Sequence, residues 1–474
     1  MRITVIGTGY VGTVTGACLS YLGHHVTCVD TDVAKVAKLQ SGESPIYEPH
    51  LDGILRSAAA QGGIEFTTDL TSATAASDVI FIAVGTPPLP SGEANLTYLE
   101  TAARSIGAAM DASRFRVVVN KSTVPVGCGN LVEALVREGI AEAHPDELRS
   151  IRFGVASNPE FLREGCALAD SLYPDRIVVG TSDAETMEVM RRLYAPLVTQ
   201  EFEAPSGLPR PSGMRQAPLL ATTLTSAEMI KYAANAFLAT KIGFANEMAN
   251  ICERVGAEVT EVMTGIGLDS RIGSRFLNPG VGWGGSCFGK DIHALLSTAR
   301  EYGYESRLLQ ASLEVNTAQR QMVIQKLQEK LFILKGRTIA LLGLAFKPDT
   351  DDLRDAPSLE IADRLLRMGA RVKVYDPVAM QACREQHPDL KLRYCDSALQ
   401  TATEADALVV VTEWQEFRQL GLAELAAVMA TPILVDGRNI FQPDAAIAAG
   451  FDYTGIGRCV SAHPPRRTVG VPAS

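Results

Sequence analysis

A glycine-rich segment around Cys287 holds the residue types that covalent catalysis requires. Gly282–Asp291 places four glycines and this cysteine directly before a helical pattern, Ile292–Glu301. The positive end of a helix favours the thiolate, which is the nucleophilic form. A thiolate adds to an aldehyde as a thiohemiacetal, whose oxidation gives a thioester that water releases as an acid. Asp291 is expected to face the same way. A glycine turn with an inert, buried cysteine is the alternative.

The amino terminus carries a second pattern, in which glycines separate a strand from a helix. Gly7, Gly9 and Gly12 follow the apolar run Ile3–Ile6, and Asp30 ends the next strand. Such glycines allow a tight turn and close approach to a pyrophosphate at a helix amino terminus. An acidic residue at the position of Asp30 binds a ribose 2′-hydroxyl, which favours NAD over NADP. A flavin site and a degenerate remnant of the fold are the alternatives.

Three further segments follow strand-like runs. Gly85–Pro88 and Asn120–Pro125 are expected at the carboxyl ends of strands, where open α/β sheets bind ligands, although both also suit ordinary turns. In Asn158–Glu164, Asn158 suits a helix N-cap and Pro159 the first helical position, which places Glu160 and Glu164 on one face. Acidic residues at a helix start also have a purely structural explanation, because the helix dipole stabilises them.

The elements that must position these residues alternate between strands and helices. Short β-branched runs and amphipathic stretches alternate over the first 120 residues and again from Lys335, which predicts two α/β domains with parallel sheets. A long helical pattern runs from Ser226 to about Val255, and 199–223, rich in proline, is expected to be a surface loop or domain boundary. The tail after Val460 is expected to be disordered.

Composition excludes several classes of protein. The chain has 474 residues, 46% hydrophobic and 21% charged, with a net charge of −10, which argues against sequence-blind nucleic-acid binding. Nine cysteines without CxxC spacing make a disulfide framework or a structural zinc site improbable, so we expect no metal. No apolar run is long enough to span a membrane, and we expect a cytoplasmic protein.

These motifs occur together in a known order. Besides the glycine turn at the amino terminus, the segments of this series are Pro45–Pro49, Lys121–Gly127, Asn158–Gly165, Pro174–Arg176, Lys231–Asn235, Gly284–Asp291, Gly343–Thr350 and Asp436–Arg438. In these segments the chain closely resembles the UDP-glucose 6-dehydrogenases of the nucleotide-sugar dehydrogenase family. The resemblance implies two Rossmann-like, doubly wound α/β domains joined by a long central helix. It also implies oxidation of the C6 alcohol of UDP-glucose to UDP-glucuronate, with two NAD and one water.

The resemblance also assigns residues by position. It implies the catalytic residues Cys287, Lys231, Asp291, Asn235, Glu160 and Thr123. It implies contacts to NAD from Gly7, Gly9, Tyr10, Val11, Gly12, Asp30, Lys35, Thr86, Ser122, Thr123, Glu164 and Arg354. For the substrate it implies Glu160, Phe161, Leu162, Glu164, Lys231, Asn235, Arg271, Phe276, Leu277, Gly280, Gly284, Phe346, Lys347 and Arg438. Arg271 matches a side chain that comes from the partner subunit, so a homodimer is implied.

Domain bounds and competing functions complete these expectations. We expect a dinucleotide-binding domain over 1–215, a central helical region with the cysteine loop over 216–330, and a domain for the UDP-sugar over 331–474. GDP-mannose or UDP-N-acetylmannosamine as substrate is the closest alternative. A single-step NAD dehydrogenase and a non-catalytic dinucleotide sensor are remote ones. The 199–220 loop looks longer than in the most compact relatives and has no functional explanation.

Overall fold

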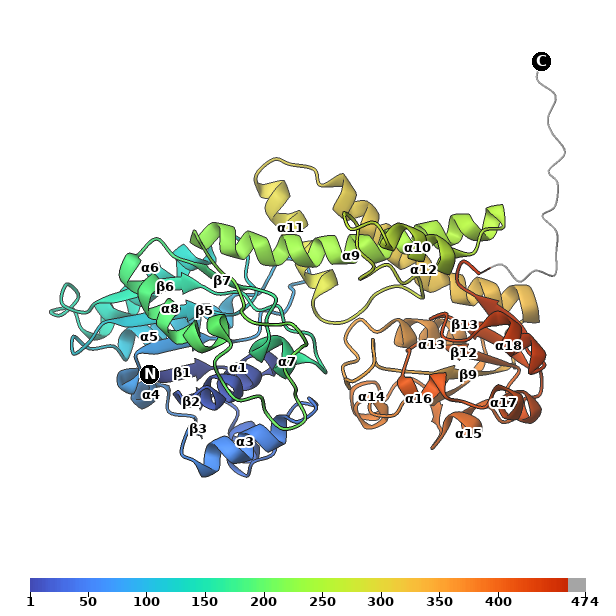
Figure 1. Cartoon of the computed structure of the whole chain (residues 1–474), viewed down its shortest axis with the longest axis horizontal. Helices are drawn as coiled ribbons and strands as arrows, with labels where there is room; N and C mark the ends of the chain where they lie inside the picture. Colours follow the sequence, from blue (N-terminus) through green and yellow to red (C-terminus); the bar gives the residue numbers. More distant parts are fainter. Residues whose placement is uncertain (459–474) are drawn as a thin grey trace, which may run out of the picture. The chain divides into compact units, whose positions relative to one another are not determined.

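The computed structural model describes residues 1–458, which form two compact units (Figure 1). Unit 1 comprises residues 1–234 and 293–304, and unit 2 comprises residues 235–292 and 305–458 of the described chain. Two helices contribute to both units: α9 (Leu224–Val255) and α11 (Phe288–Glu301). The tail for which disorder is expected lies outside the described residues.

Unit 1 contains an eight-stranded sheet of order β3-β2-β1-β4-β5-β6-β7-β8, which begins with the six-strand order of a dinucleotide-binding fold. Neighbouring strands are parallel except β6 and β7. The strands are β1 (Arg2–Ile6), β2 (His25–Val29), β3 (Ile64–Thr67), β4 (Val79–Ile82), β5 (Arg116–Asn120), β6 (Phe153–Ser157), β7 (Ile177–Gly180) and β8 (Leu219–Thr222). The helices are α1 (Tyr10–Tyr21), α2 (Val33–Gln40), α3 (Leu51–Ala60), α4 (Leu70–Ala76), α5 (Thr97–Ala108), α6 (Cys128–Ala143), α7 (Ala167–Leu172) and α8 (Ala184–Thr199).

Both faces of this sheet are buried, as alternation along β5 shows. Val117 and Val119 belong to one apolar cluster, with α1, α3, α7 and α8, whereas Val118 belongs to a second cluster with α5 and α6. Successive strand side chains point to opposite faces, so a strand covered on both faces reads as a continuous apolar run. The sequence expectation for β5, Arg116–Asn120, is confirmed to the residue.

Unit 2 repeats the architecture with a six-stranded, all-parallel sheet of order β11-β10-β9-β12-β13-β14. Its strands are β9 (Thr338–Leu342), β10 (Arg371–Tyr375), β11 (Leu392–Tyr394), β12 (Ala407–Val410), β13 (Ile433–Asp436) and β14 (Asp452–Gly455). Its helices are α10 (Val259–Gly267), α12 (Arg307–Leu331), α13 (Pro357–Arg367), α14 (Met380–Gln386), α15 (Ala398–Ala402), α16 (Gln415–Arg418), α17 (Leu422–Val428) and α18 (Pro443–Ala448). The predicted fold class is therefore confirmed.

The segment 199–220 is more ordered than the surface loop we expected. Its last residues form β8, which pairs with β7. Phe202 stacks on Tyr173 with ring centroids 5.9 Å apart, and Arg210 donates to the carbonyl of Phe202 at 2.7 Å. Tyr173 in turn donates to the carbonyl of Leu208 at 2.8 Å. Because Phe202 and Leu208 also pack against the core, the segment covers the apolar face that carries α7 and α8.

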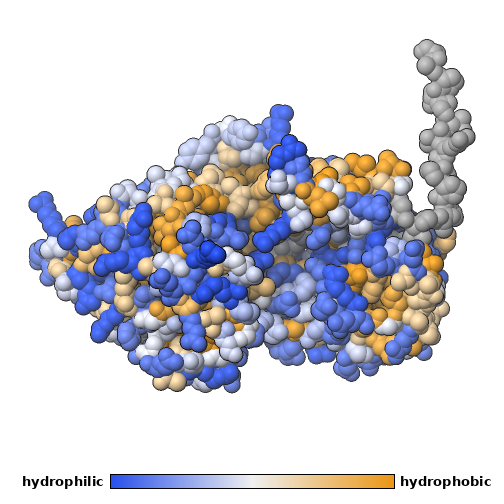
Figure 2. Space-filling model, in the orientation of Figure 1, coloured by the Kyte–Doolittle hydropathy of each residue, from blue (hydrophilic) through white to orange (hydrophobic). Residues whose placement is uncertain are grey.

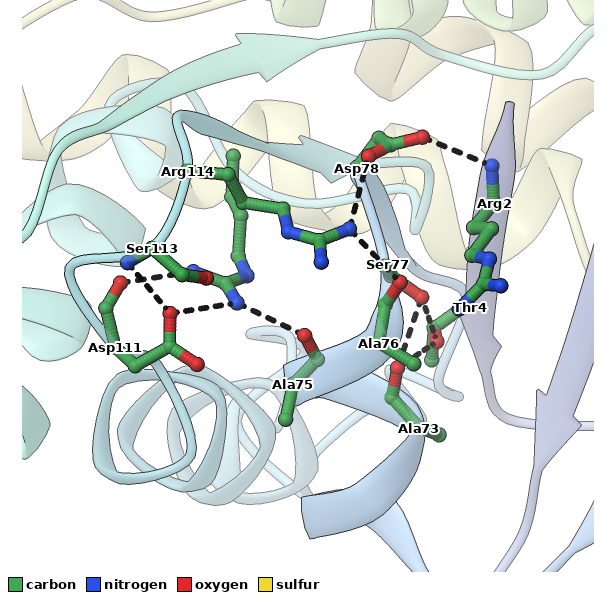
Figure 3. Close-up of polar contacts among 11 residues, drawn as sticks. Arg2, Thr4, Ala73, Ala75, Ala76, Ser77, Asp78, Asp111, Ser113 and Arg114 are labelled. Carbon is green, nitrogen blue, oxygen red and sulfur yellow. Dashed lines mark hydrogen bonds and ion pairs between the residues drawn. The ribbon is translucent and has the colours of Figure 1, made fainter.

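A fully buried arginine anchors the amino-terminal edge of the unit 1 sheet. Arg116, the first residue of β5, donates to the carbonyls of Asp111 and Ala75 at 2.9 Å each and pairs with the Asp111 carboxylate at 3.1 Å. Figure 3 shows the acceptors Asp111 and Ala75, and the neighbouring pair of Arg114 with Asp78. The hydrogen bond from Ser113, despite partial burial and with help from Arg116, lowers the pKa of Asp111 to about 2. This network ties β5 to the end of α4.

Candidate active site

The glycine turn between β1 and α1 has the backbone that a pyrophosphate site requires. Gly7 has φ +96, and a Cβ on Gly12 would lie 1.8 Å from the Gly7 carbonyl oxygen, so only glycine fits at Gly12. A Cβ on Gly9 would meet nothing within 4 Å, which leaves the backbone open at the start of α1. The turn therefore fits an anion at a helix amino terminus.

Asp30 lies next to this turn, as the sequence predicts. Its carboxylate accepts hydrogen bonds from the backbone and hydroxyl of Thr8 at 2.8 and 2.7 Å, and from the backbone of Asp32 at 3.0 Å. Burial by itself raises the pKa of Asp30, but these bonds and the nearby Lys35 bring it below its ordinary value. An ionised carboxylate keeps lone pairs beyond these three bonds, so it suits a ribose hydroxyl and repels a 2′-phosphate.

The two turns predicted at strand ends are brought together. β4 pairs with β5, and the Thr86 hydroxyl donates to the carbonyl of Thr123 at 2.7 Å. The Ser122 hydroxyl donates to the carbonyl of Val84 at 2.7 Å. These hydroxyls thus fix two neighbouring turns at the carboxyl edge of the sheet, where ligands of such sheets bind.

Tyr10 is joined to the loop that carries Glu164. The backbone of Gly165 donates to the Tyr10 oxygen at 2.6 Å and to the Glu48 carboxylate at 2.7 Å, and the Tyr10 hydroxyl also donates to Glu48. Burial and the Glu48 carboxylate raise the pKa of Tyr10. Glu48 lies within the Pro45–Pro49 motif, and its role as a link between these segments was not predicted. Val11, on the same turn, packs against the apolar core.

The helix expected to begin at Asn158 is absent. Residues 158–163 are irregular, and α7 begins only at Ala167. The Asn158 side chain does not cap a helix: it accepts from Lys121 at 3.0 Å and from Tyr194 at 2.5 Å, and donates to the carbonyl of Val178 at 2.7 Å. Tertiary partners thus replace the local cap, and the expectation that Glu160 and Glu164 share a helix face is wrong.

Glu160 instead forms a buried ion pair with Lys231. The Lys231 amine donates to Glu160 Oε1 at 2.8 Å, and the backbone of Leu162 donates to Glu160 Oε2 at 2.6 Å. Burial opposes ionisation of Glu160, yet Lys231 holds its pKa below the ordinary value. The Phe161 ring carries two cations: Arg176 lies 3.7 Å and Lys231 5.5 Å from its centroid. The structure therefore brings together Glu160, Phe161 and Lys231, three residues that the resemblance assigns to the site.

Lys121 is a member of this cluster that sequence reasoning did not single out. Besides its bond to Asn158, it lies close enough to Glu160 and Lys231 for their charges to affect it. Burial lowers the pKa of Lys121 to about 8, while Glu160 raises it and Lys231 lowers it further. Its place next to Ser122 and Thr123 was the available signal.

In unit 2, Cys287 is partly exposed and directly precedes α11, as predicted. The Ser286 hydroxyl lies 3.6 Å from the Cys287 sulfur, and the backbone of Asp291 donates to the Cys287 carbonyl at 2.9 Å. The buried Asp291 carboxylate accepts from Asn235 at 2.6 Å and from Lys290 at 2.6 Å. Asn235 and Asp291, both of which the resemblance assigns to the site, are thus in direct contact. Lys290 was not predicted.

Several of the residues expected to contact substrate lie in or near the cysteine loop of unit 2, residues 282–287. A Cβ on Gly280 would lie 3.1 Å from Arg438 Nη1, and Arg438 donates to the carbonyl of Gly282 at 3.1 Å. The Lys347 amine lies 5.8 Å from the Phe346 ring centroid. Two others have separate surroundings: Leu277 is buried in the small cluster of α9 and α10, next to Phe276, which has φ +63.

Two predicted arginines are exposed. The Arg354 side chain is 61% exposed and pairs with Asp352 at 2.7 Å. The Arg271 side chain is 86% exposed and pairs with Asp269 at 2.6 Å. Both guanidinium groups are therefore presented to solvent on short loops, where each is accessible to a ligand or to another chain.

Among residues 1–458, no group of three or more His, Cys, Asp or Glu side chains is arranged to hold a metal ion. None of the helices described is long and apolar enough to cross a membrane.

Comparison with known proteins gives three matches to one family. Residues 1–198, 225–318 and 340–443 match, in order, the NAD binding domain, the central domain and the UDP binding domain of the UDP-glucose/GDP-mannose dehydrogenase family. The chain belongs to this family. The UDP binding domain supports a UDP-sugar as the substrate class of the family member described here.

Several known proteins match this dehydrogenase family member over nearly its whole length. It is 45% identical over 458 residues to a UDP-glucose 6-dehydrogenase of Bacillus subtilis, covering 97% of this chain and 98% of that protein. It is 46% identical to a UDP-glucose 6-dehydrogenase of Rhizobium meliloti, covering 97% and 100%. A solved UDP-glucose dehydrogenase of Pyrobaculum islandicum superposes with a TM-score of 0.84 at 37% identity, covering 96% and 98%.

Proposed function

We propose that this chain is an NAD-dependent oxidoreductase that converts UDP-glucose to UDP-glucuronate by two successive oxidations. One observation carries the proposal: a thiol at the start of α11 occurs in a chain that also has the glycine turn and Asp30 of an NAD site. Relatives named as UDP-glucose 6-dehydrogenases at 45–46% identity over nearly the whole chain support this substrate.

The first oxidation removes a proton and a hydride from the C6 alcohol. NAD, when bound, supplies the hydride acceptor, and the proton is released to solvent. We assign Lys231 to the developing alkoxide, because an ammonium held by a buried carboxylate is a preorganised donor for negative charge. Asn235 lies one turn further along α9 and, with Asp291, forms the second polar pair of the proposed machinery.

The second oxidation uses the sulfur of Cys287. Its thiolate adds to the C6 aldehyde, so that an S–C bond forms and the carbonyl electrons become an alkoxide. Loss of a second hydride gives a thioester. Water, for which we assign Glu160 as general base and Thr123 as an orienting group, attacks the thioester carbon, the S–C bond breaks and the thiolate returns. One sugar, one water and two NAD thus yield one carboxylate, two NADH and three protons.

Substrate contacts are assigned to cationic and glycine-rich positions. Lys347 and Arg438 suit the diphosphate of a nucleotide sugar. We assign Gly280 and Gly284 to backbone contacts with the substrate. Neither position has room for a side chain, because a Cβ would lie 2.9 Å from the Gly437 carbonyl oxygen or 2.3 Å from the Asp355 carbonyl oxygen. GDP-mannose and UDP-N-acetylmannosamine are the alternatives, because the thiol, lysine and aspartate serve any C6 alcohol equally. The domain bounds 1–215, 216–330 and 331–474 and a cytoplasmic location stay predictions.

We also propose a homodimer. One face of α9 carries an apolar stripe whose exposure to solvent is unfavourable. Its members recur at helical spacing and are 45–66% exposed: Phe237, Phe244, Ile251 and Val255. The Lys241 amine, within this stripe, donates to the carbonyl of Ile272 at 3.2 Å, which places the segment of Arg271 beside it. On the face drawn in Figure 2, apolar surface is visible where α9 and α10 lie in Figure 1. A second copy on the stripe brings Arg271 to its partner.

An end-point assay tests the proposed reaction. With limiting UDP-glucose and excess NAD, we expect about two NADH and one UDP-glucuronate per sugar, because both oxidations precede release of the acid. About one NADH per sugar would contradict the thioester route. No NADH from UDP-glucose, with turnover of GDP-mannose or UDP-N-acetylmannosamine, would overturn the substrate assignment.

A further inference from the structure

The backbone of the cysteine loop is held by side chains of α12, a helix to which the proposed mechanism assigns nothing. Asn316 accepts a hydrogen bond from the backbone of Trp283 at 2.8 Å and donates to the Trp283 carbonyl at 3.0 Å. One buried side chain therefore satisfies both backbone polar groups of Trp283. A Cβ on Gly282 would lie 2.7 Å from the Asn316 oxygen, so the glycine allows the contact.

Arg320, one turn further along α12, joins the same loop to a second one. It donates to the Trp283 carbonyl at 2.7 Å, to the Asp355 carboxylate at 2.7 Å and to Glu360 at 3.1 Å. Asp355 has φ +51, and Arg320 also donates to its carbonyl at 3.2 Å. A guanidinium has several donors in one plane, which lysine lacks, so it suits a bridge between two backbones.

The two loops that Arg320 joins are in direct contact. The Gly285 backbone donates to the carbonyl of Arg354 at 2.9 Å. A Cβ on Gly284 would lie 2.3 Å from the Asp355 carbonyl oxygen, and one on Gly285 would lie 2.7 Å from the Phe346 ring. The loop directly before Cys287 thus packs tightly against the 346–355 segment, and its path depends on that segment.

We propose that Asn316 and Arg320 are positioning residues for the Cys287 sulfur. Trp283 is four residues before the cysteine, and its ring packs edge-on against Phe288, the first residue of α11, at 5.9 Å. Without these contacts the Trp283 backbone can move relative to α11, and the Cys287 sulfur is then no longer held in one position. This inference rests on the proposed function, since it assigns the two side chains to the thiol-dependent second oxidation.

Four variants test the proposal against a matched control. Asn316→Leu and Arg320→Met remove the contacts, while Asn316→Asp and Arg320→Lys keep the size or the charge. Lys326→Met is the control, because Lys326 lies on the same helix and pairs with Glu253 at 2.6 Å, away from the loop. Each protein is assayed with UDP-glucose for the first-turnover NADH burst, and with the C6 aldehyde of UDP-glucose for the second oxidation.

We expect kcat for the aldehyde to fall about 100-fold in Asn316→Leu and Arg320→Met, because a nucleophile misplaced by about 1 Å loses that much. The burst rate and KM for NAD should change less than about threefold, since neither requires the thiol. Arg320→Lys should recover part of the rate, and Lys326→Met should match the unsubstituted enzyme.

Equal loss of burst and aldehyde oxidation, or aldehyde rates equal to those of Lys326→Met, would overturn the proposal. Failure of all four variants to fold would also overturn it, because the side chains would then serve stability alone. The proposed function is judged separately, from the NADH yield of the unsubstituted enzyme. A yield of about one NADH would refute that function whatever the variants do.

Discussion

A single carboxylate and two lysine amines set the electrostatics of the buried cluster in unit 1. Glu160 stays ionised despite burial because Lys231 donates to it at 2.8 Å, and Lys121 adds a second positive charge. Burial of two like charges near one carboxylate disfavours at least one of the ammonium groups. At the scale of the residue, burial thus brings the pKa of Lys121 down to about 8, whereas Lys231 holds the pKa of Glu160 below its ordinary value.

Comparison with Lys121→Met should show, through the pH dependence of stability, that burial of the protonated Lys121 amine is unfavourable. Burial lowers the pKa of Lys121 to about 8, while an unfolded lysine keeps its proton to about pH 10.4. Between these values the unfolded chain binds more protons, so the stability of the unsubstituted protein rises with pH relative to the variant. The free energy of unfolding in urea is measured for both proteins from about pH 7 to pH 10. As the pH rises, the difference between them should shift in favour of the unsubstituted protein. A constant difference would contradict the shifted pKa.

Cys287→Ala should abolish UDP-glucuronate formation by about 1,000-fold or more, because no other group replaces a covalent nucleophile. Product is quantified by chromatography after incubation with NAD. Cys166→Ala, which removes an exposed thiol elsewhere, is the control and should form product at an unchanged rate. Acid production by Cys287→Ala at a normal rate would refute the thioester route.

At the scale of the element, the two ends of β5 have different roles: the first residue contributes to stability, and the last leads to the polar cluster. Arg116 closes the buried network at its first residue, and Asn120 at its last leads into Lys121 and Ser122. Parallel strands place all their carboxyl ends on one edge, so the opposite edge is available for structural contacts. The arginine therefore stabilises the unit without facing the polar cluster.

Arg116→Met should destabilise the protein by about 1–3 kcal/mol, because two buried carbonyls lose their donors. Chemical denaturation gives the free energy of unfolding, and kcat per folded molecule should stay unchanged. Arg114→Met is the control: its pair with Asp78 is 3.4 Å long and exposed, so the loss should be below about 1 kcal/mol. A similar cost for both variants would argue against the buried network as its source.

At the scale of the whole molecule, the apolar stripe on α9 and the exposed Arg271 both bear on the proposed homodimer. Phe244→Asp places a charge within the stripe and should halve the molar mass measured by light scattering, because a buried unpaired charge opposes association. Ile333→Asp, at another exposed apolar position, should leave the mass unchanged. A dimer that survives Phe244→Asp would show that the stripe is not the interface.

Subunit complementation tests whether Arg271 acts on its partner. Arg271→Ala should raise KM for UDP-glucose, since a cation that contacts substrate is lost. Co-expressed with Cys287→Ala, it forms mixed dimers with one intact site. At UDP-glucose concentrations well below the raised KM, activity should therefore return to about a quarter of normal by random pairing. Absence of recovery, with mixed dimers shown to form, would place Arg271 in its own subunit's site.

The sequence by itself determined the fold class, the glycine turn with Asp30, and the cysteine before α11. Each depends on local rules: apolar alternation, the steric freedom of glycine, and the position of a residue relative to a helix start. These rules act over a few residues and are therefore readable along the chain. They also located β5 and the long helix α9 to within two residues.

Only the tertiary structure decided what Asn158, Lys121, Asn316 and Arg320 contact. Locally Asn158 suits a helix cap, but Lys121, Tyr194 and Val178 supply its partners from three other elements. Asn316 and Arg320 lie 33 and 37 residues beyond Trp283, whose backbone they hold, within an ordinary helical pattern. Buried polar groups take whichever partners the folded chain brings within reach, and distance along the sequence does not restrict that choice.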